Sequence, residues 1–324
     1  GSAGFVLAAG ASASLLVSAI RPHSASAPSY TAPASLRSIV ETASRNPASA
    51  ARVLAPTVPV VVAVLVGLGY RPVNVALLAY VAYGLPVGAV AVRRAKVDDA
   101  KDREIQDFVH AVSGHVSLGR PFSEAVERVA EEVDLGALQS DVDQLAFTLG
   151  LTASPDDDAT DGRAAALDRF VERVGTPMAE QTIGLVVGAL DAGSDAEDVF
   201  ETLQTEIGKL YHERKALRSS LLVYVAVGWT TALLVVGIVV AVNAYVLDGF
   251  AQLSTVSSGP GITIDPTAVD PPRDRYRFYV VTQATMLGCG WFAGTASRGR
   301  YEALLHSGAL VVVCHVVFTG VGMI

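Results

Sequence analysis

Long apolar runs interrupt the chain at intervals and leave one large polar segment near its middle. The clearest run, residues 221–247, contains no ionised side chain, and residues 73–92 and 303–324 are apolar over a similar length. About 20 predominantly apolar residues are needed to cross the hydrocarbon core of a membrane, where a helix satisfies its own backbone hydrogen bonds. The pattern therefore predicts membrane-spanning helices.

Three further runs, at residues 3–20, 53–69 and 278–296, are weaker candidates. A secretory signal peptide has basic residues ahead of its apolar stretch. The nearest basic residue to residues 3–20 is Arg21, which follows the run, so a span is the better interpretation. The lack of an initial Met suggests a segment of a longer protein or a processed one. We expect six spans, with five as the alternative, at residues 3–20, 53–69, 73–92, 220–247, 277–296 and 302–324.

The polar segment, residues 97–218, has apolar residues at helical spacing and not in the alternation of a strand. They form five stripes: Ile105, Phe108, Val109, Val112 and Val116; Phe122, Val126, Val129 and Val133; Leu167, Phe170 and Val174; Ile183, Val187 and Leu190; and Val199, Leu203, Ile207 and Leu210. Each stripe predicts an amphipathic helix with one face to bury, and several such helices form a bundle.

The predicted fold class is therefore all-α, a polytopic membrane protein with one helical-bundle domain. The N-terminal membrane region is expected at residues 1–96, the bundle at 97–218, and the C-terminal membrane region at 219–324. The composition agrees, because only 17% of the residues are charged, against about a quarter in soluble domains.

Charge is distributed unevenly along the chain. Residues 97–218 contain 26 acidic and 11 basic residues, a net charge of −15, whereas the remainder has a net charge of +7. Lysine occurs 4 times and arginine 20 times. Abundant carboxylates with little lysine are typical of a salt-rich cytoplasm, as in haloarchaea, and we favour this halophilic interpretation. The alternative is an acidic docking face for a basic partner.

The basic residues also predict an orientation, since the cytoplasmic loops of membrane proteins are enriched in Lys and Arg. In one set of loops 15 basic residues lie towards the ends of the spans, and the alternate set carries only Arg71, Arg273, Arg275 and Arg277. The first set, which includes the domain at 97–218, is expected to be cytoplasmic, with both ends of the chain outside.

Candidate chemistry is sparse. The sequence contains no P-loop and no glycine-rich dinucleotide turn, and Cys289 and Cys314 lack the spacing of a metal or redox pair. His306 and His315 lie on opposite faces of the last predicted span, where each neutral imidazole is expected to hydrogen-bond a neighbouring helix. We expect no catalytic, cofactor-binding or metal-binding residue, no enzyme activity and no binding of nucleic acid.

A transporter is the main alternative class. Transporters carry charged residues or broken helices near the bilayer midplane. Here the third predicted span has only a possible kink at Gly84-Leu85-Pro86, and the fourth has only Asn243. A membrane permease, or a sensor with a helical cytoplasmic domain, stays as the alternative function.

The order of these segments resembles the type II secretion system F-domain family, which includes the platform proteins of type IV pili, archaeal flagella and tight-adherence pili. The nearest local match is Leu118-Gly119-Arg120-Pro121-Phe122-Ser123-Glu124-Ala125-Val126, similar to the family's Gly-x-Pro-hydrophobic-x-x-Ala-hydrophobic helix start. Residues 190–199 and the basic run 209–218 are also similar. The resemblance covers residues 93–247. Many archaeal members carry the domain twice, and this chain shows one copy.

This resemblance implies a platform protein of the cytoplasmic membrane that couples an ATPase to the assembly of pilin-like subunits. The implied partners are a secretion or pilus assembly ATPase, pilin-like subunits, membrane lipid and further copies of the chain. A helix over residues 196–217 is expected to continue into the span that starts near Ser219. The candidate partner and coupling surface comprises Gly119, Pro121, Ser123, Glu124, Lys209, Arg214, Lys215 and Arg218.

Overall fold

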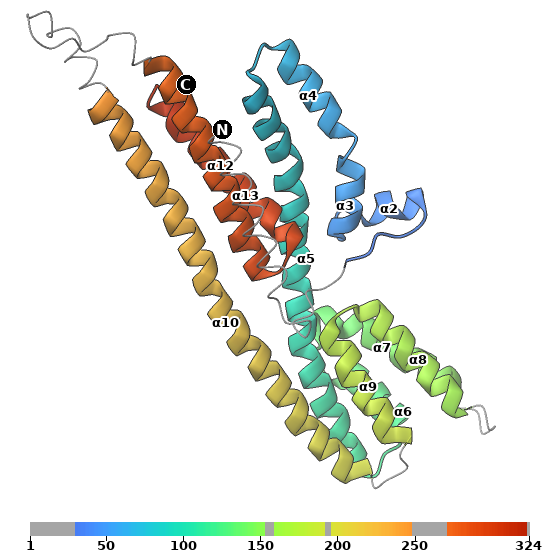
Figure 1. The fold of residues 1–324 in the computed structure, drawn as a ribbon. Coiled ribbons are helices and arrows are strands. Elements are labelled where there is room, and N and C mark those ends of the chain that lie inside the picture. The colour runs from blue at the N-terminus through green and yellow to red at the C-terminus, as the bar shows by residue number, and fades with distance from the viewer. Residues whose placement is uncertain (1–29, 153–158, 192–195, 248–270, 323–324) are drawn as a thin grey trace, which may run out of the picture. The chain divides into compact units, whose positions relative to one another are not determined.

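The computed structural model describes residues 30–152, 159–191, 196–247 and 271–322. Within these ranges every regular element is a helix (Figure 1), which confirms the predicted all-α membrane protein. The elements are α2 (Leu36–Thr42), α3 (Pro47–Leu54), α4 (Thr57–Gly67), α5 (Pro72–Ser117), α6 (Phe122–Glu132), the 3₁₀ turn η1 (Gly136–Leu138), α7 (Gln139–Thr152), α8 (Ala159–Val174), α9 (Pro177–Asp191), α10 (Ala196–Val242), the π-helical turn η2 (Asn243–Leu247), α12 (Pro271–Ser297) and α13 (Arg300–Gly320).

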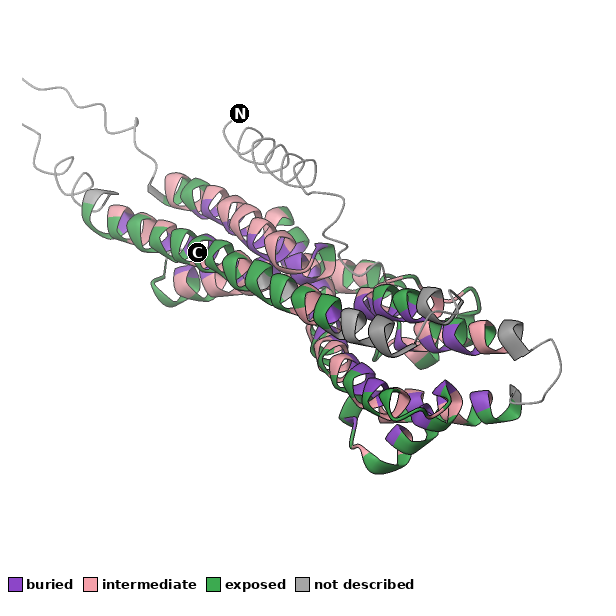
Figure 2. Cartoon of the chain, turned by 90° about the horizontal axis from the view of Figure 1, so that it is seen from below, coloured by how far each residue is buried: buried purple, intermediate pink, exposed green. Residues whose placement is uncertain are grey.

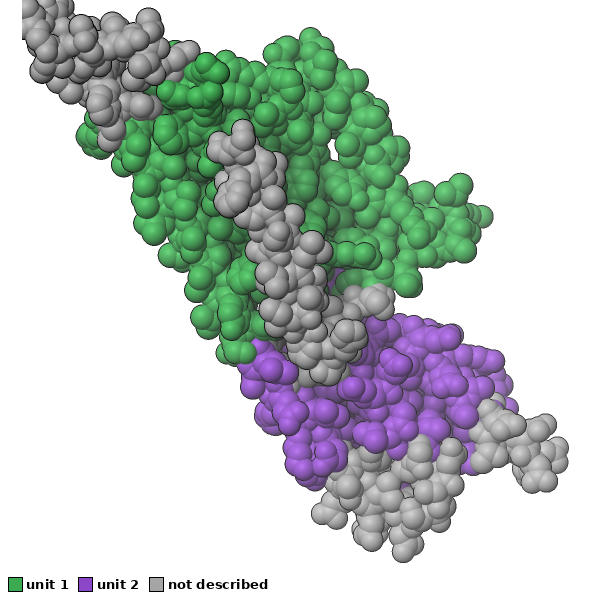
Figure 3. Space-filling view, in the orientation of Figure 1, with its two compact units in different colours: residues 1–92, 219–324 green, residues 93–218 purple. Residues whose placement is uncertain are grey.

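The chain divides into two compact units (Figure 3). The membrane unit contains residues 1–92 and 219–324, and the polar unit contains residues 93–218. Both boundaries fall inside helices, because α5 is 46 residues long and α10 is 47 residues long. The prediction that a helix from residue 196 continues into the span near Ser219 is confirmed by the unbroken course of α10.

Three helices are long and apolar enough to cross a membrane. They are Pro72–Ser117, Thr205–Tyr245 and Arg300–Gly320, and they contain the predicted spans at 73–92, 220–247 and 302–324 except for a few terminal residues. The predicted span at 277–296 is helical as part of α12, but α12 is not among the three. Polar residues such as Gln283 and three threonines lower its hydropathy. The predicted span at 3–20 lies outside the described residues.

The segment predicted as one continuous span at residues 53–69 is broken. Helix α3 ends at Leu54 and α4 begins at Thr57, and the two are bent by 45°. Pro56 lies at the break and Pro59 lies in the first turn of α4. Neither has an N–H to donate to the carbonyl four residues earlier, which favours a break in the helix at this point. Helix α4 has 11 residues and is therefore about 16 Å long, too short to cross a bilayer alone. The two helices qualify only as a bent pair.

Glycines allow close helix packing in the membrane unit. A Cβ on Gly294 would lie 2.2 Å from Cα of Ala303, and one on Gly290 would lie 2.3 Å from Cα of Ser307. The backbones of α12 and α13 therefore touch, as is common where small residues meet between membrane helices. On another side of α13, a Cβ on Gly88 of α5 would lie 2.6 Å from Cβ of Leu305.

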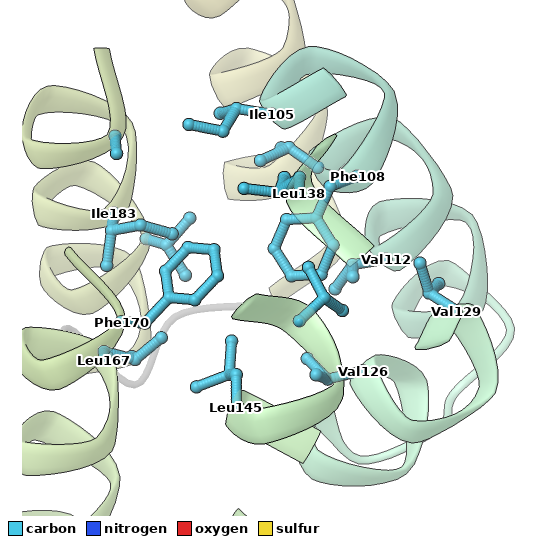
Figure 4. Close-up of a cluster of buried hydrophobic side chains, with 14 of the residues drawn as sticks. Ile105, Phe108, Val112, Val126, Val129, Leu138, Leu145, Leu167, Phe170 and Ile183 are labelled. Atoms are coloured by element: carbon cyan, nitrogen blue, oxygen red, sulfur yellow. The ribbon is translucent and has the colours of Figure 1, made fainter. Parts of the chain in front are cut away.

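The polar unit has its own apolar core. Figure 4 shows the rings of Phe108 and Phe170 side by side, with their centroids 5.9 Å apart. The core joins residues from all five predicted stripes with Leu135, Leu138, Val142, Leu145 and Leu149, which the stripes did not include. Buried and exposed residues alternate around each helix (Figure 2), as amphipathic packing requires.

Candidate functional site: the partner surface

Four of the predicted partner residues lie at the turn between α5 and α6. Gly119 has a φ of 80°, and its N–H donates to the carbonyl of Val116 over 2.8 Å, while Arg120 N–H donates to the carbonyl of His115 over 3.3 Å. These two bonds define a Schellman motif, in which glycine takes the left-handed position that ends a helix. The end of helix α5 therefore explains why a glycine stands at position 119.

Helix α6 starts directly after this turn. Pro121 is extended, with ψ of 146°, and its carbonyl accepts from Ala125 N–H over 2.9 Å. Phe122, Ala125 and Val126 face the core, whereas Glu124 is exposed and Ser123 is half-buried. The carboxylate of Glu124 lies in the first turn, where the helix dipole favours negative charge. The turn therefore presents polar groups outward from a rigid base.

The other four predicted residues lie along α10, at the end of the polar unit. The ammonium of Lys209 donates to Glu206 Oε1 over 2.8 Å, and this hydrogen bond, with the carboxylate charge, raises the pKa of Lys209. Lys215 is exposed. Arg214 and Arg218 lie in α10, and their side chains are outside the described part of the structure.

The two groups do not form one patch. Gly208 of α10 lies beside Gln106 of α5. The side-chain Nε2 of Gln106 is 4.0 Å from the position that a Cβ on Gly208 would take. The α5–α6 turn lies beyond Ser117, eleven residues further along α5, which corresponds to about 17 Å. Since α10 continues from Gly208 in the opposite direction, the basic run moves away from the turn. The predicted surface is therefore two separate regions of the polar unit.

A polar network that the sequence did not reveal holds the connection between α6 and α7. Lys101 of α5 pairs with Asp141 of α7 at 2.6 Å, and both side chains are largely buried. One turn along α5, Glu104 Oε2 accepts from the backbone N–H of Leu138 over 3.0 Å. Gly136 has a φ of 47°, in the left-handed region that favours glycine, and a Cβ there would lie 2.7 Å from Glu104 Oε1, which would have to shift. This network fixes the start of α7, and no local motif signals it.

Helix α7 also exposes two large apolar side chains that the sequence analysis did not single out. Phe147 is 68% exposed and Leu151 is 67% exposed, one turn apart on the same face. The periodic pattern of α7 could have shown this, because its buried residues Val142, Leu145 and Leu149 already form a complete stripe.

The two histidines of α13 bond to different helices. Trp229 Nε1–H of α10 donates to His306 Nδ1 over 2.9 Å, and the hydroxyl of Tyr279 of α12 lies 2.9 Å from His315 Nδ1. An indole N–H can only donate, so His306 Nδ1 carries a lone pair and the imidazole is neutral. The predicted opposite faces and hydrogen bonds to neighbouring helices are confirmed. Among the described residues, no three His, Cys, Asp or Glu side chains are placed to hold a metal ion.

Comparison with protein families found one match. Residues 108–243, from the polar unit into the apolar half of α10, match the family described as "Type II secretion system (T2SS), protein F". Comparisons with curated proteins and with solved structures found no significant match.

Proposed function

Because residues 108–243 of this chain belong to the type II secretion system protein F family, we propose that it is the membrane platform protein of a pilus-like, archaeal-flagellum-like or type II secretion machine. The family is one of membrane platform proteins of secretion and pilus-type systems. The protein would couple a cytoplasmic ATPase to the assembly of pilin-like subunits, and the ATP chemistry would belong to that partner. The family match is the observation that carries this proposal.

The course of α10 supports a coupling role. The family match ends at Asn243, so it includes the polar part of α10 and its apolar part as one helix. Gly208 is the one residue of strongly helix-weakening type between Ala196 and Ser219, and a single glycine costs about 1 kcal/mol relative to alanine. A continuous helix is suited to carry a tilt or rotation of the polar unit into the bilayer.

The proposal places the polar unit in the cytoplasm, which a labelling experiment tests. Ser117 and Tyr70 are exposed and lie on opposite sides of the span predicted at 73–92. In a background without Cys289 and Cys314, we expect Tyr70→Cys to react with an impermeant thiol reagent in intact cells. Ser117→Cys should react only after the cells are opened. The reverse labelling pattern would show that the orientation is wrong.

A second experiment tests the coupling itself. Inserting Gly-Gly-Gly after Arg218 keeps every charge, but three glycines disfavour helix by about 3 kcal/mol relative to three alanines. We expect the glycine insertion to reduce the rate of filament assembly or secretion by roughly tenfold, which corresponds to about 1.4 kcal/mol of activation free energy. The protein should still reach the membrane.

The matched control is Ala-Ala-Ala at the same position, which shifts the register equally and keeps the helix. It should retain more activity than the glycine variant. Normal assembly by the correctly inserted glycine variant would exclude coupling through α10, and normal assembly by a strain without the protein would exclude the platform role.

A further inference from the structure

Residues 30–54, the α2–α3 segment, are attached to the start of α13 in the membrane unit. The ring centroids of Tyr30 and Tyr301 are 6.3 Å apart, and Tyr301 lies in the first turn of α13. The side-chain amide of Asn46, the N-cap of α3, donates to the carbonyl of Thr31 over 2.9 Å. The segment therefore belongs to the end of the membrane unit at which α13 begins.

The start of α13 marks one surface of the membrane. Helix α13 is apolar enough to cross a bilayer and has 21 residues, so it is about 31 Å long. This length matches the hydrocarbon core of about 30 Å, which places its first turn at the headgroups. There the guanidinium of Arg300 lies 5.1 Å from the ring centroid of Tyr301, and tyrosine is enriched at this level. The α2–α3 segment therefore lies near the headgroups.

Helix α2 exposes apolar side chains beside charged ones. Leu36 is 83% exposed and Val40 is 65% exposed, one turn apart on the same face, whereas Ile39 beside them is buried. Arg37 and Glu41 occupy the adjacent side of the helix and pair at 3.0 Å. Figure 1 shows α2 lying at an angle to α4. An apolar stripe next to a charged side is the pattern of a helix that lies in a membrane surface.

The charge of this part of the chain suits an anionic surface. Residues 1–56 contain four arginines and one acidic residue, Glu41. This count includes every residue before α2, so none of those residues adds a carboxylate. Arg37, Arg45 and Arg52 are exposed. Basic residues are attracted to anionic lipid headgroups, and arginine can donate two parallel hydrogen bonds to phosphate oxygens.

We propose that α2 lies in the plane of the membrane surface, with Leu36 and Val40 inserted just below anionic lipid headgroups. Insertion removes two large apolar side chains from water, and the arginines of residues 37–52 add electrostatic attraction to the headgroups. Since α3 leads directly into the apolar helix α4, the inserted helix would hold the bent α3–α4 pair at the surface. This role is independent of any assembly partner.

Fluorescence quenching of the full-length protein in vesicles of phosphatidylcholine and phosphatidylglycerol tests this proposal. With Cys289 and Cys314 replaced by alanine, a single cysteine at Leu36, Val40 or Glu41 carries a fluorophore. At Leu36 and Val40 we expect strong quenching by a nitroxide near the headgroup end of a lipid chain, and weak quenching by iodide present on both sides of the membrane. Glu41→Cys is the matched control. It is on the same helix, turned by about 140° from Leu36, and should be quenched mainly by iodide.

Arg45→Gln tests the electrostatic part with the label at Leu36. One arginine near an anionic surface is worth about 1 kcal/mol, so the ratio of inserted to free α2 should fall about fivefold. The comparison is made at the phosphatidylglycerol content that gives half-maximal quenching by the lipid nitroxide. The control Arg128→Gln removes one exposed arginine from α6 of the polar unit and should leave the ratio unchanged. Helical content and elution as a single species check that each variant is folded.

The competing explanations give different quenching patterns. Equal quenching by iodide at Leu36, Val40 and Glu41 would show that α2 is in water and would overturn the proposal. Protection of Leu36 and Val40 from both quenchers would show that protein covers them, either the residues before Tyr30 or another copy of the chain, and would also reject it. Unchanged quenching in vesicles of phosphatidylcholine alone would reject the role of anionic headgroups.

Discussion

Replacing Gly294 with alanine is expected to destabilise the packing of α12 on α13 by about 2 to 3 kcal/mol, at the upper end for overpacking a tight contact. The added methyl group would lie 2.2 Å from Cα and 2.4 Å from the backbone nitrogen of Ala303. Backbone atoms cannot turn aside as a side chain can, so the two helices would have to separate. Gly290→Ala, with Cα of Ser307 at 2.3 Å, should have a similar effect.

The measurement is unfolding of the purified protein in mixed micelles with rising denaturing detergent, followed by helical content. Gly288 of α12 is the matched control, because nothing lies within 4 Å of the position of its Cβ. Gly288→Ala should leave stability unchanged or raise it, since alanine favours helix by about 1 kcal/mol over glycine. If the Gly288 and Gly294 variants unfold at the same concentration of denaturing detergent, the backbones of α12 and α13 are not in close contact in the purified protein.

Replacing Phe170 with alanine is expected to cost about 3 to 5 kcal/mol of the stability of the polar unit. Its side chain is 0% exposed and lies against Phe108 and other core residues. The substitution removes most of a buried ring and leaves a cavity. Since domains are usually stable by only about 5 to 15 kcal/mol, a large part of the free energy of unfolding should be lost.

Phe147→Ala makes the same chemical change at a residue that is 68% exposed, and it should change stability by less than about 0.5 kcal/mol. Chemical unfolding of residues 93–218 expressed alone compares the two variants. If that fragment does not fold, tryptic cleavage of the polar unit in the intact protein gives the same comparison. A Phe147 variant as unstable as the Phe170 variant would show that Phe147 is covered and the assigned core is incomplete.

The amphipathic stripes were readable from the sequence because each depends on a local periodicity. Ile105, Phe108 and Val112 recur at helical spacing, and all three are buried. The same reasoning placed His306 and His315 on opposite faces, although it could not name Trp229 and Tyr279 as their partners. Those partners come from other helices.

The glycines of the spans show where local reasoning fails. Gly84-Leu85-Pro86 suggested a possible kink, which stays a prediction, and α5 continues as one helix through Pro86. A Cβ on Gly84 would lie 3.3 Å from the carbonyl oxygen of Leu304, so this glycine serves contact with α13. The sequence shows that a position lacks a side chain, and only the neighbouring helix shows why.

The polar unit shows the same difference between local and tertiary causes. Gly119 and Pro121 were recognised by a motif, and the Schellman motif at Gly119 gives that motif a local structural cause. The Lys101–Asp141 pair joins α5 to α7 and has no local signature. The role of the eight candidate residues in binding a partner stays a prediction.

By itself the sequence determined the helical class, the apolar helices and the stripes of the polar unit, because each follows from composition or from spacing within one helix. The resemblance to the F-domain family came from the order of these segments and from short motifs. Only the tertiary structure decided that α12 and α13 touch through Gly290 and Gly294, that Lys101 pairs with Asp141, and that Arg71 reaches Tyr276. These contacts join residues of different helices. Their partners are chosen by how the surfaces fit in space, and a one-dimensional pattern does not contain that information.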